Sequence, residues 1–475
     1  MTELREQLDR FRSSSSVLEG DGRQPEPTAE ELAHPIVAPG SDALLPEGIV
    51  YQAGWEPVAD GIARHARLAA RALGRTGLPV TLRSQPIKRM ELDDELDPAV
   101  VSEIDHLRKT SIGSAALAIR QVIIHSHLFL ENVVAPYGAR YSGFENELAV
   151  YKSTIVYTSW ERSTVHPEVV AVLNRCGRVW VPCQMNYNVF RNAGVRRVDV
   201  IPCPFEPNDD RTLVERKKDP ATGKVVTTIR EIRPTSFIPS PRGSEDVPTG
   251  KRFYAIGKWE PRKNYHALVG AFLSEFGAGE RASLLLKTHE WGAWKDYPSV
   301  AQSVDFWLGT AAVRANGWTP ENFSRNVAIV TKKLPDEALY LLHKKNNIYV
   351  TCSHGEAWDL PAFDAKAAGN RLVYTGWGGA EDYADPGSDY MISLNTELEP
   401  VHSGYGWESD ACWKTCTVEE IRKALRASEP PARRVLPPEL VRRFGFRAVG
   451  SLMLRSIEEL SGEAYERLRL TGGFG

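Results

Sequence analysis

The segment SHGEAWDLPAFDAKAAG at residues 353–369 carries two acidic side chains, Glu356 and Asp364, that are eight positions apart, besides Asp359 between them, and this spacing suits a sugar or ribose site. The apolar run NIYVTCS precedes Glu356, which predicts that Glu356 lies at the carboxyl end of a strand. Pro361 fits the first turn of a following helix, and Asp364 lies near that turn. Both carboxylates can then accept hydrogen bonds from paired hydroxyls in one cleft. The alternative for Asp364 is a carboxylate favoured only by the helix dipole.

A second segment, FYAIGKWEPRKNYHALVGAF, has the order strand, glycine, cations, helix. Gly257 permits a sharp turn where the strand ends. Lys258 and Lys263 add positive charge to the N–H groups and dipole of a helix N-terminus, a combination that suits a phosphate. The alternative is that both lysines are solvated residues of a surface loop.

A third segment, TGWGGAEDYA, follows another apolar run. Gly378 and Gly379 permit close approach of the backbone to a ligand and can donate N–H groups to a phosphate. A plain turn explains these glycines equally well.

Polar residues also follow predicted strands in the first half of the chain. Gly61 precedes the amphipathic helix GIARHARLAARAL, His125 and His127 follow QVII, and Glu161 follows IVYTSW. These residues are candidates for ligand contacts, and packed or solvent-facing histidines are the alternative. Glu161 is the strongest of the three ionisable residues because it directly follows an apolar strand and Trp160.

All these segments belong to two successive series of short apolar strands that alternate with helices. The first series starts near Gly48 and the second near Arg252. Such alternation predicts parallel α/β sheets with right-handed crossovers. We therefore expect two Rossmann-like parallel-sheet domains facing across a cleft, with ligands at the carboxyl ends of the strands.

The sequence between residues 208 and 252 is rich in turn residues and marks the domain boundary, with a hairpin predicted around KVVTTIREI. The expected parts are a tail or surface arm at 1–45, a first α/β domain at 46–235, a linker at 236–252, a second α/β domain at 253–430, and terminal helices at 431–475 that brace the first domain.

Composition agrees with a two-domain globular protein. The chain has 475 residues, of which 42% are hydrophobic and 25% charged, and this length exceeds what one core usually holds. Its formal net charge of -3 gives no sign of a nucleic-acid binder. The first residues lack the apolar core of a secretory signal, and no run of about 18 apolar residues occurs. We expect a cytoplasmic protein without a membrane span.

The cysteines indicate neither a disulfide framework nor a metal site. There are six, none lies in a CxxC pair, and none lies near a histidine at zinc-finger spacing. We expect reduced thiols.

In this order, the segments resemble a retaining glycosyltransferase of the GT-B fold, from the family with G-R-L-x-x-x-K and E-x7-E segments. GKWEPRK is similar to the first segment, and HGEAWDLPAFDAKAAG is similar to the second, written in full as G-E-G-F-G-L-P-x-x-E-A-x-A-x-G. The helix GIARHARLAARAL resembles the family's first glycine loop and helix, and WERSTVHPEVVAVLNRCGRVWVPC resembles the middle of its acceptor domain. The resemblance covers most of residues 48–460.

The resemblance implies that the first domain binds an acceptor and the second a nucleotide sugar. It implies that Lys258 and Lys263 hold the donor diphosphate, that Glu356 faces the sugar and that Asp364 faces the ribose. The expected donor-binding residues are Gly61, Gly257, Lys258, Lys263, Glu356, Ala357, Leu360, Asp364, Gly378 and Gly379. The expected catalytic residues are Glu356, Lys263, Lys258, His127 and Glu161.

Three positions depart from the family pattern. Asp364 is one methylene shorter than the usual glutamate, and Ala357 and Asp359 replace two glycines. Ala357 adds a methyl group beside the expected donor, and Asp359 adds a negative charge near an anion. These departures indicate an unusual donor sugar or a shifted loop, and an inactive or altered member is the alternative.

The implied reaction transfers a sugar from a nucleotide diphosphate to an acceptor with retention at the anomeric carbon. The lysines and nearby N–H groups would stabilise the leaving diphosphate, and Glu356 would orient sugar hydroxyls. This scheme requires no metal or other cofactor. The expected partners are the nucleotide sugar and a carbohydrate, lipid-linked or other small acceptor, and nucleic acid is not expected.

Three alternatives share the predicted fold: a sugar epimerase or phosphorylase, a non-catalytic module that binds sugar nucleotide or glycan, and a DNA-modifying glycosyltransferase. The Lys258 and Lys263 segment together with the Glu356 to Asp364 spacing favours a transferase over the first. The near-neutral charge disfavours the last. The sequence does not name the donor base, the sugar, the acceptor or the oligomeric state.

Overall fold

The computed structural model describes the chain in segments. The tail predicted at 1–45, His125 and His127 lie outside them. The described residues are 48–53, 61–84, 98–112, 116–124, 154–206, 213–218, 225–230, 250–290, 297–332, 334, 336–395, 398–401 and 412–470.

Six parallel strands form the first sheet, in the order β2-β1-β3-β4-β5-β6. Its strands are β1 (Gly48–Ala53), β2 (Val80–Ser84), β3 (Ala116–Val122), β4 (Thr154–Thr158), β5 (Arg178–Val181) and β6 (Val198–Val200). The helices of this half are α3 (Gly61–Gly74), α4 (Pro98–Lys109), α7 (Pro167–Leu173) and α8 (Gln184–Asn192).

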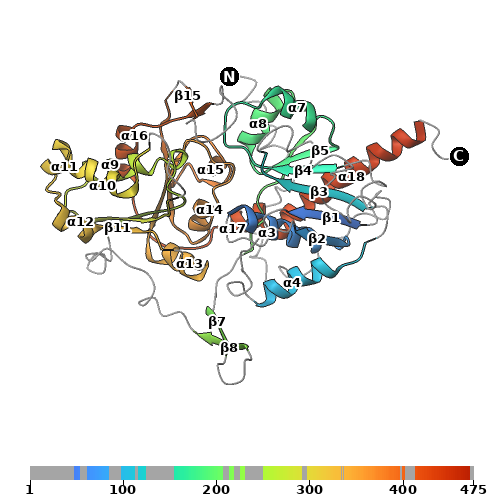
Figure 1. The fold of residues 1–475 in the computed structure, drawn as a ribbon, viewed down its shortest axis with the longest axis horizontal. Helices are drawn as coiled ribbons and strands as arrows, with labels where there is room; N and C mark the ends of the chain where they lie inside the picture. Colours follow the sequence, from blue (N-terminus) through green and yellow to red (C-terminus); the bar gives the residue numbers. More distant parts are fainter. Residues whose placement is uncertain are drawn as a thin grey trace. The chain divides into compact units, whose positions relative to one another are not determined.

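Alternating side chains of the first sheet fill two cores, one on each face. Ile155 and Tyr157 of β4 pack with α3 and α4, whereas Val156 between them packs with α7 and α8. Because successive side chains of a strand point to opposite faces, a strand that is apolar at every position requires helices on both sides. Figure 1 shows helices on both sides of each sheet.

The second sheet also has six parallel strands, in the order β11-β10-β9-β12-β13-β14. Its strands are β9 (Lys251–Ile256), β10 (Ala282–Lys287), β11 (Val327–Val330), β12 (Ile348–Thr351), β13 (Arg371–Thr375) and β14 (Tyr390–Ile392). Its helices are the 3-10 turn η2 (Pro261–Lys263), α9 (Tyr265–Glu275), α10 (Val300–Leu308), α11 (Ala311–Ala315), α12 (Pro320–Asn326), α13 (Asp336–Lys345), α14 (Leu360–Ala367), α15 (Ala380–Tyr383) and α16 (Val418–Ala427).

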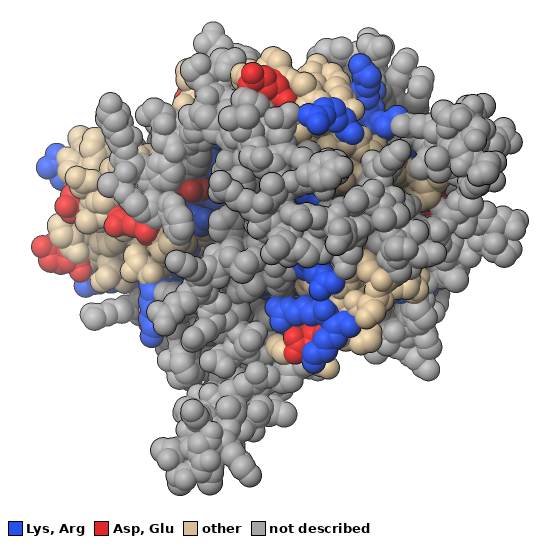
Figure 2. All heavy atoms as spheres, turned by 45° about the vertical axis from the view of Figure 1, so that its right-hand side comes forward, with Lys and Arg blue, Asp and Glu red and all other residues tan. Residues whose placement is uncertain are grey.

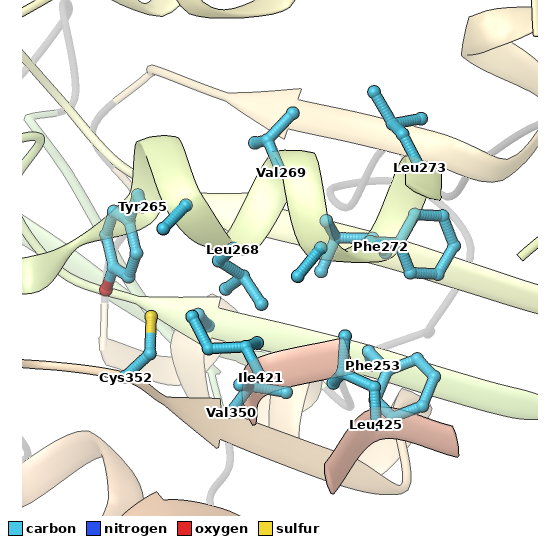
Figure 3. Packing of buried hydrophobic residues seen from close by; sticks show 14 of the residues in the cluster. Phe253, Tyr265, Leu268, Val269, Phe272, Leu273, Val350, Cys352, Ile421 and Leu425 are labelled. Atoms are coloured by element: carbon cyan, nitrogen blue, oxygen red, sulfur yellow. The ribbon is translucent and has the colours of Figure 1, made fainter. Parts of the chain in front are cut away.

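One face of the second sheet lies under α9 and α16. Phe253 of β9 and Val350 of β12 pack against Leu268 and Phe272 of α9, with Ile421 of α16 closing the cluster (Figure 3). The opposite face packs against α13 and α14. The two predicted parallel sheets are therefore confirmed.

Two short antiparallel pairs accompany the sheets. The strands β7 (Leu213–Lys218) and β8 (Val225–Arg230) form the hairpin predicted around KVVTTIREI. The strands β15 (Leu398–Pro400) and β16 (Cys412–Lys414) form the other pair. Within the described segments, no helix combines the length and the apolar character that crossing a membrane requires.

The two halves of the chain contact each other through a shared core and a helix cap. Met185 at the start of α8 belongs to the same buried cluster as Phe363 of α14. The Oδ2 atom of Asp382 accepts a hydrogen bond of 2.9 Å from the backbone N–H of Gln184 at the N-terminus of α8. Cys183, which precedes α8, makes no side-chain cap hydrogen bond of its own, so a residue of the second half supplies the cap.

The last helix, α18 (Phe446–Leu470), returns to the first half, whereas α17 (Pro438–Phe444) before it packs in the buried cluster that contains α14. Val449, Met453 and Ile457 of α18 are buried in the core on the α3 side of the first sheet. The indole N–H of Trp180 on β5 donates a hydrogen bond of 2.8 Å to the hydroxyl of Ser456.

Candidate functional site

The loop after β9 buries two adjacent cations. Arg262 and Lys263 lie in the 3-10 turn η2, and each is only 9% exposed. Gly257 at the end of β9 has no space for a side chain, because a Cβ atom there would lie 2.5 Å from the hydroxyl of Tyr265 and 3.2 Å from Cε of Lys263. Gly257 therefore allows Lys263 to pass close to the backbone.

Glu356 follows β12, which is the neighbour of β9 in the sheet, and it meets both cations. Lys263 Nζ donates to Glu356 Oε1, and Arg262 Nη1 lies 2.9 Å from the same oxygen. Burial raises the pKa of Glu356, but the charges of Arg262 and Lys263 outweigh it and lower that pKa to about 2. Glu356 is thus an ionised acceptor at neutral pH and does not supply protons.

The backbone after Glu356 explains one departure from the family pattern. Asp359 has φ 61° and ψ 71°, a left-handed conformation that glycine adopts freely and that aspartate tolerates. Its Oδ1 atom accepts a hydrogen bond of 3.4 Å from the N–H of Ala362 and so caps α14. Burial, and then the charge of Glu356, raise the pKa of Asp359 to about 6. Ala357, the other departure, is buried.

Asp364 faces the first half of the chain. Both of its carboxylate oxygens bind the guanidinium of Arg64 on α3. Gly61 begins the same helix, and a Cβ atom there would touch Leu360 at 3.7 Å. The predicted residues Gly61, Leu360 and Asp364 therefore lie together where α3 meets α14, and the ribose role of Asp364 stays a prediction.

Gly378 and Gly379 pack against the backbone of the Glu356 loop. A Cβ atom on Gly379 would lie 2.6 Å from the carbonyl oxygen of Ala357, and Gly378 has φ +139°. The N–H of Gly379 donates to the carbonyl of Glu356 at 2.9 Å, and the N–H of Gly378 donates to Glu381 at 3.4 Å. Both N–H groups would have to leave these partners before they could bind a phosphate.

Glu161 brings the first half to this cluster. It follows β4, and its Oε1 atom lies 3.1 Å from Arg262 Nη1. The backbones of Gly355 and Glu161 also approach each other closely. A Cβ atom on Gly355 would lie 2.2 Å from the carbonyl oxygen of Glu161. Burial raises the pKa of Glu161 to about 7, with the charge of Arg262 opposing that rise and the charge of Glu356 adding to it.

Lys258, in the loop after β9, acts on His289, in the loop after β10. Burial lowers the pKa of His289, the charges of Lys287 and Lys258 lower it further, and the charge of Glu260 opposes them. Lysines of these two loops can stabilise negative charge that develops on a leaving group.

Arg262 and Glu260 contribute to this site but were not among the residues predicted for it. Arg262 stands in the segment GKWEPRK, where three cations are close together, and nothing in their spacing tells which of them point inward. Arg262 Nη2 binds Glu260 Oε1 at 2.7 Å, a two-residue contact that is available only because of the 3-10 turn.

The overall architecture matches solved structures at low sequence identity. The α,α-trehalose 6-phosphate synthase from Burkholderia multivorans is 12% identical, with a TM-score of 0.50 over 88% of this chain and 100% of that chain. The α,α-trehalose-phosphate synthase (UDP-forming) from Burkholderia vietnamiensis is 10% identical, with the same TM-score over 88% of this chain and 100% of that chain. Both are GT-B proteins. This chain has the GT-B fold.

The GT-B fold predicted from the resemblance is confirmed. In GT-B terms, β1 to β6 form one Rossmann-like sheet and β9 to β14 the other. No protein-family model and no curated protein matches the sequence. The assignment of the fold therefore depends on structural similarity alone. Any role of an individual residue has to be argued from its geometry in this chain.

Proposed function

We propose that this chain is a glycosyltransferase that moves a sugar from a nucleotide diphosphate donor to an acceptor with retention of anomeric configuration. The observation that supports it most is the buried contact of Lys263 with Glu356, which joins the loops after two neighbouring strands. In open parallel sheets, the carboxyl ends of the strands are where ligands bind.

The chemistry assigns different tasks to the two sides of this contact. Lys263, together with Lys258, stabilises the diphosphate as it leaves and the sugar gains positive charge. Glu356 stays ionised because its pKa is about 2, so it accepts hydrogen bonds from sugar hydroxyls and orients the ring. Cations and backbone N–H groups supply the positive charge, and we propose that no metal is needed.

The partners follow from the fold and the charge. One of the similar structures is named as UDP-forming, so a uridine diphosphate sugar is the first donor to test. The acceptor, a carbohydrate, a lipid-linked sugar or another small molecule, would enter beside Glu161, and we keep His127 as a candidate on that side. The formal net charge of -3 favours a small anionic donor over nucleic acid as the partner. On the face shown in Figure 2, the described Lys and Arg side chains form separate groups with acidic side chains beside several of them.

We also propose a cytoplasmic location. All six cysteines are free thiols, and five of them are buried. Burial raises the pKa of Cys203 and that of Cys176, which keeps these thiols protonated. Unpaired thiols are typical of a reducing compartment.

Two measurements test the proposed function. A thermal-shift screen against nucleotide sugars identifies the donor, because a ligand that binds the folded state raises the melting temperature. The donor found is then incubated with the protein and an acceptor panel, and release of nucleoside diphosphate is measured by chromatography. We expect Lys263→Ala to lower the rate by roughly 100-fold, as for other charge-stabilising groups.

The matched control is Lys423→Ala, which removes a cation on α16 whose side chain is 68% exposed. It should leave the rate unchanged. If no nucleotide sugar raises the melting temperature, the proposed donor class is wrong.

A non-catalytic nucleotide-sugar-binding protein is the second candidate, because Ala357, Asp359 and Asp364 depart from the family pattern. Tight binding of a donor without release of nucleoside diphosphate across the acceptor panel would favour it.

A further inference from the structure

One guanidinium joins three carboxylates in this site. Arg262 Nη1 lies 3.1 Å from Glu161 Oε1 and 2.9 Å from Glu356 Oε1, and Nη2 lies 2.7 Å from Glu260 Oε1. The same Nη1 atom also donates a hydrogen bond of 2.7 Å to the carbonyl of Gly355. Arg262 is therefore the charged link between the first half and the Glu356 loop.

Glu161 differs from the other two acids in origin and in exposure. It comes from the first half, whereas Glu260 and Glu356 belong to the second. Its side chain is 39% exposed, compared with 7% for Glu260 and 10% for Glu356. Among these three carboxylates, Glu161 is the one that can move away from Arg262 without opening the second half.

The ion pairs of this cluster carry an excess of negative charge before a donor binds. Among the described residues that pair here, Glu161, Glu260 and Glu356 are three ionisable acids beside two cations, Arg262 and Lys263. A diphosphate brings further negative charge into a partly buried place. Departure of one carboxylate would lower the electrostatic cost of binding it.

We propose that Arg262 is a further binding residue for the donor diphosphate, and that Glu161 is its counter-ion in the free protein and is displaced by the diphosphate. This inference rests on the proposed function, because it takes the cations of this loop to meet a diphosphate. An arginine suits that exchange, since its planar group binds carboxylate and phosphate oxygens with the same geometry.

Displacement changes the proton affinity of Glu161. The groups that face it are Arg262 and Lys263, which favour its ionised form, and Glu260 and Glu356, which oppose it. In the free protein its pKa is about 7. Once Glu161 has moved from Arg262 into water, burial no longer raises its pKa, which falls back towards the ordinary range of a glutamate. Binding therefore releases a proton below pH 7, and donor affinity rises as the pH increases towards 7.

The test is isothermal titration calorimetry with UDP-glucose, whose diphosphate does not titrate between pH 6 and 8.5. Titrations in two buffers of different ionisation enthalpy count the protons released. For the wild type we expect release below pH 7 and a dissociation constant that decreases as the pH rises towards 7. Glu161→Gln should remove both effects and bind UDP-glucose about tenfold more tightly at pH 8, because no counter-ion has to be displaced.

Two further variants separate the roles. Arg262→Lys should weaken binding roughly tenfold or more at every pH, because a planar charge-assisted contact is lost. Glu168→Gln is the matched control, since this exposed carboxylate on α7 has a side chain that is 57% exposed. It should keep the proton release of the wild type.

Opposite results would overturn the inference. If Glu161 only held the two halves together, Glu161→Gln would lower the melting temperature and weaken the binding of UDP-glucose. The dissociation constant would then depend on pH as it does in the wild type. UDP-glucose binding by the wild type without proton release below pH 7 would refute the exchange and leave the proposed function intact. No binding of any nucleotide sugar in the thermal-shift screen would refute the donor class itself.

Discussion

Arg64 on α3 forms a two-point ion pair with Asp364 on α14, in which Arg64 Nη2 lies 2.9 Å from Asp364 Oδ1. The two side chains are 25% and 21% exposed, so the pair is partly shielded from water. It places the carboxylate that the family resemblance assigns to a ribose in direct contact with the other half of the molecule. In the proposed function, the side chain of Asp364 therefore serves both the contact between the halves and the binding of the nucleotide.

Single substitutions of this pair should have equal effects on stability and unequal effects on binding. Arg64→Ala and Asp364→Ala each remove the same ion pair, and we expect each to lower the free energy of unfolding by about 1 kcal/mol. Only Asp364→Ala should weaken binding of UDP-glucose, by roughly tenfold, because it removes a hydrogen-bond acceptor for the ribose. Urea unfolding and calorimetry measure the two quantities. An equal loss of affinity in both variants would contradict the ribose role.

Gly379 should tolerate no side chain. A Cβ atom there would lie 2.5 Å from Cα of Trp358. Because this is a backbone atom, no rotamer change can relieve the clash. We expect Gly379→Ala to lower the free energy of unfolding by about 2 kcal/mol and to displace the Glu356 loop. Urea unfolding and nucleotide-sugar binding check both effects.

Gly462 provides the control for this change. It lies in α18, and no atom lies within 4 Å of a Cβ atom built on it. Gly462→Ala should stabilise the protein by up to about 1 kcal/mol, the difference in helix propensity. Equal effects of the two substitutions would show that close packing at Gly379 is not the cause.

His65 should make the protein sensitive to acid. Its ring lies in the core of the first half, with Nε2 2.8 Å from the hydroxyl of Tyr157, which donates to the carbonyl of Ile201 at 2.6 Å. Burial lowers the pKa of His65 to about 4. As the pH falls from about 6.5 towards 4, the unfolded chain takes up a proton that the folded protein does not, so stability is lost.

The expected loss is about 3 kcal/mol over that interval. Urea unfolding of the wild type and of His65→Gln at several pH values isolates it, because other titrating groups contribute equally to both proteins. A difference between the two proteins that does not change with pH would rule out the proposed titration.

Local patterns predicted much of the fold. The segments RFYAIGKW, NYHALVGAFLSEFG and LPAFDAKAAG contain β9, α9 and α14 as expected. The third strand starts at Ala116, earlier than expected, because the residues before Arg120 are also apolar. The helices α10 to α12 were not predicted. They are short and have exposed polar faces, so they produce little hydrophobic periodicity in the sequence.

The site was predictable only in part. Gly257, Lys263 and Glu356 could be expected near one another because each lies in a segment that follows a strand, and strand ends meet at one edge of a parallel sheet. The partners Arg64 and Glu161 could not be assigned, because they reach Asp364 and Arg262 through the docking of one half on the other. The left-handed backbone of Asp359 shows why a glycine-like residue is needed there, and the family pattern had indicated this position.

The burial of α18 in the first half has a consequence for synthesis on the ribosome. Val449, Met453 and Ile457 fill the core of a sheet whose own strands end at Val200. The first half is therefore synthesised long before α18. Helices α3 and α4 can cover part of this apolar face early, but the part that α18 buries stays exposed until the second half has been synthesised. Chaperone demand during translation should depend on the time taken to synthesise the second half.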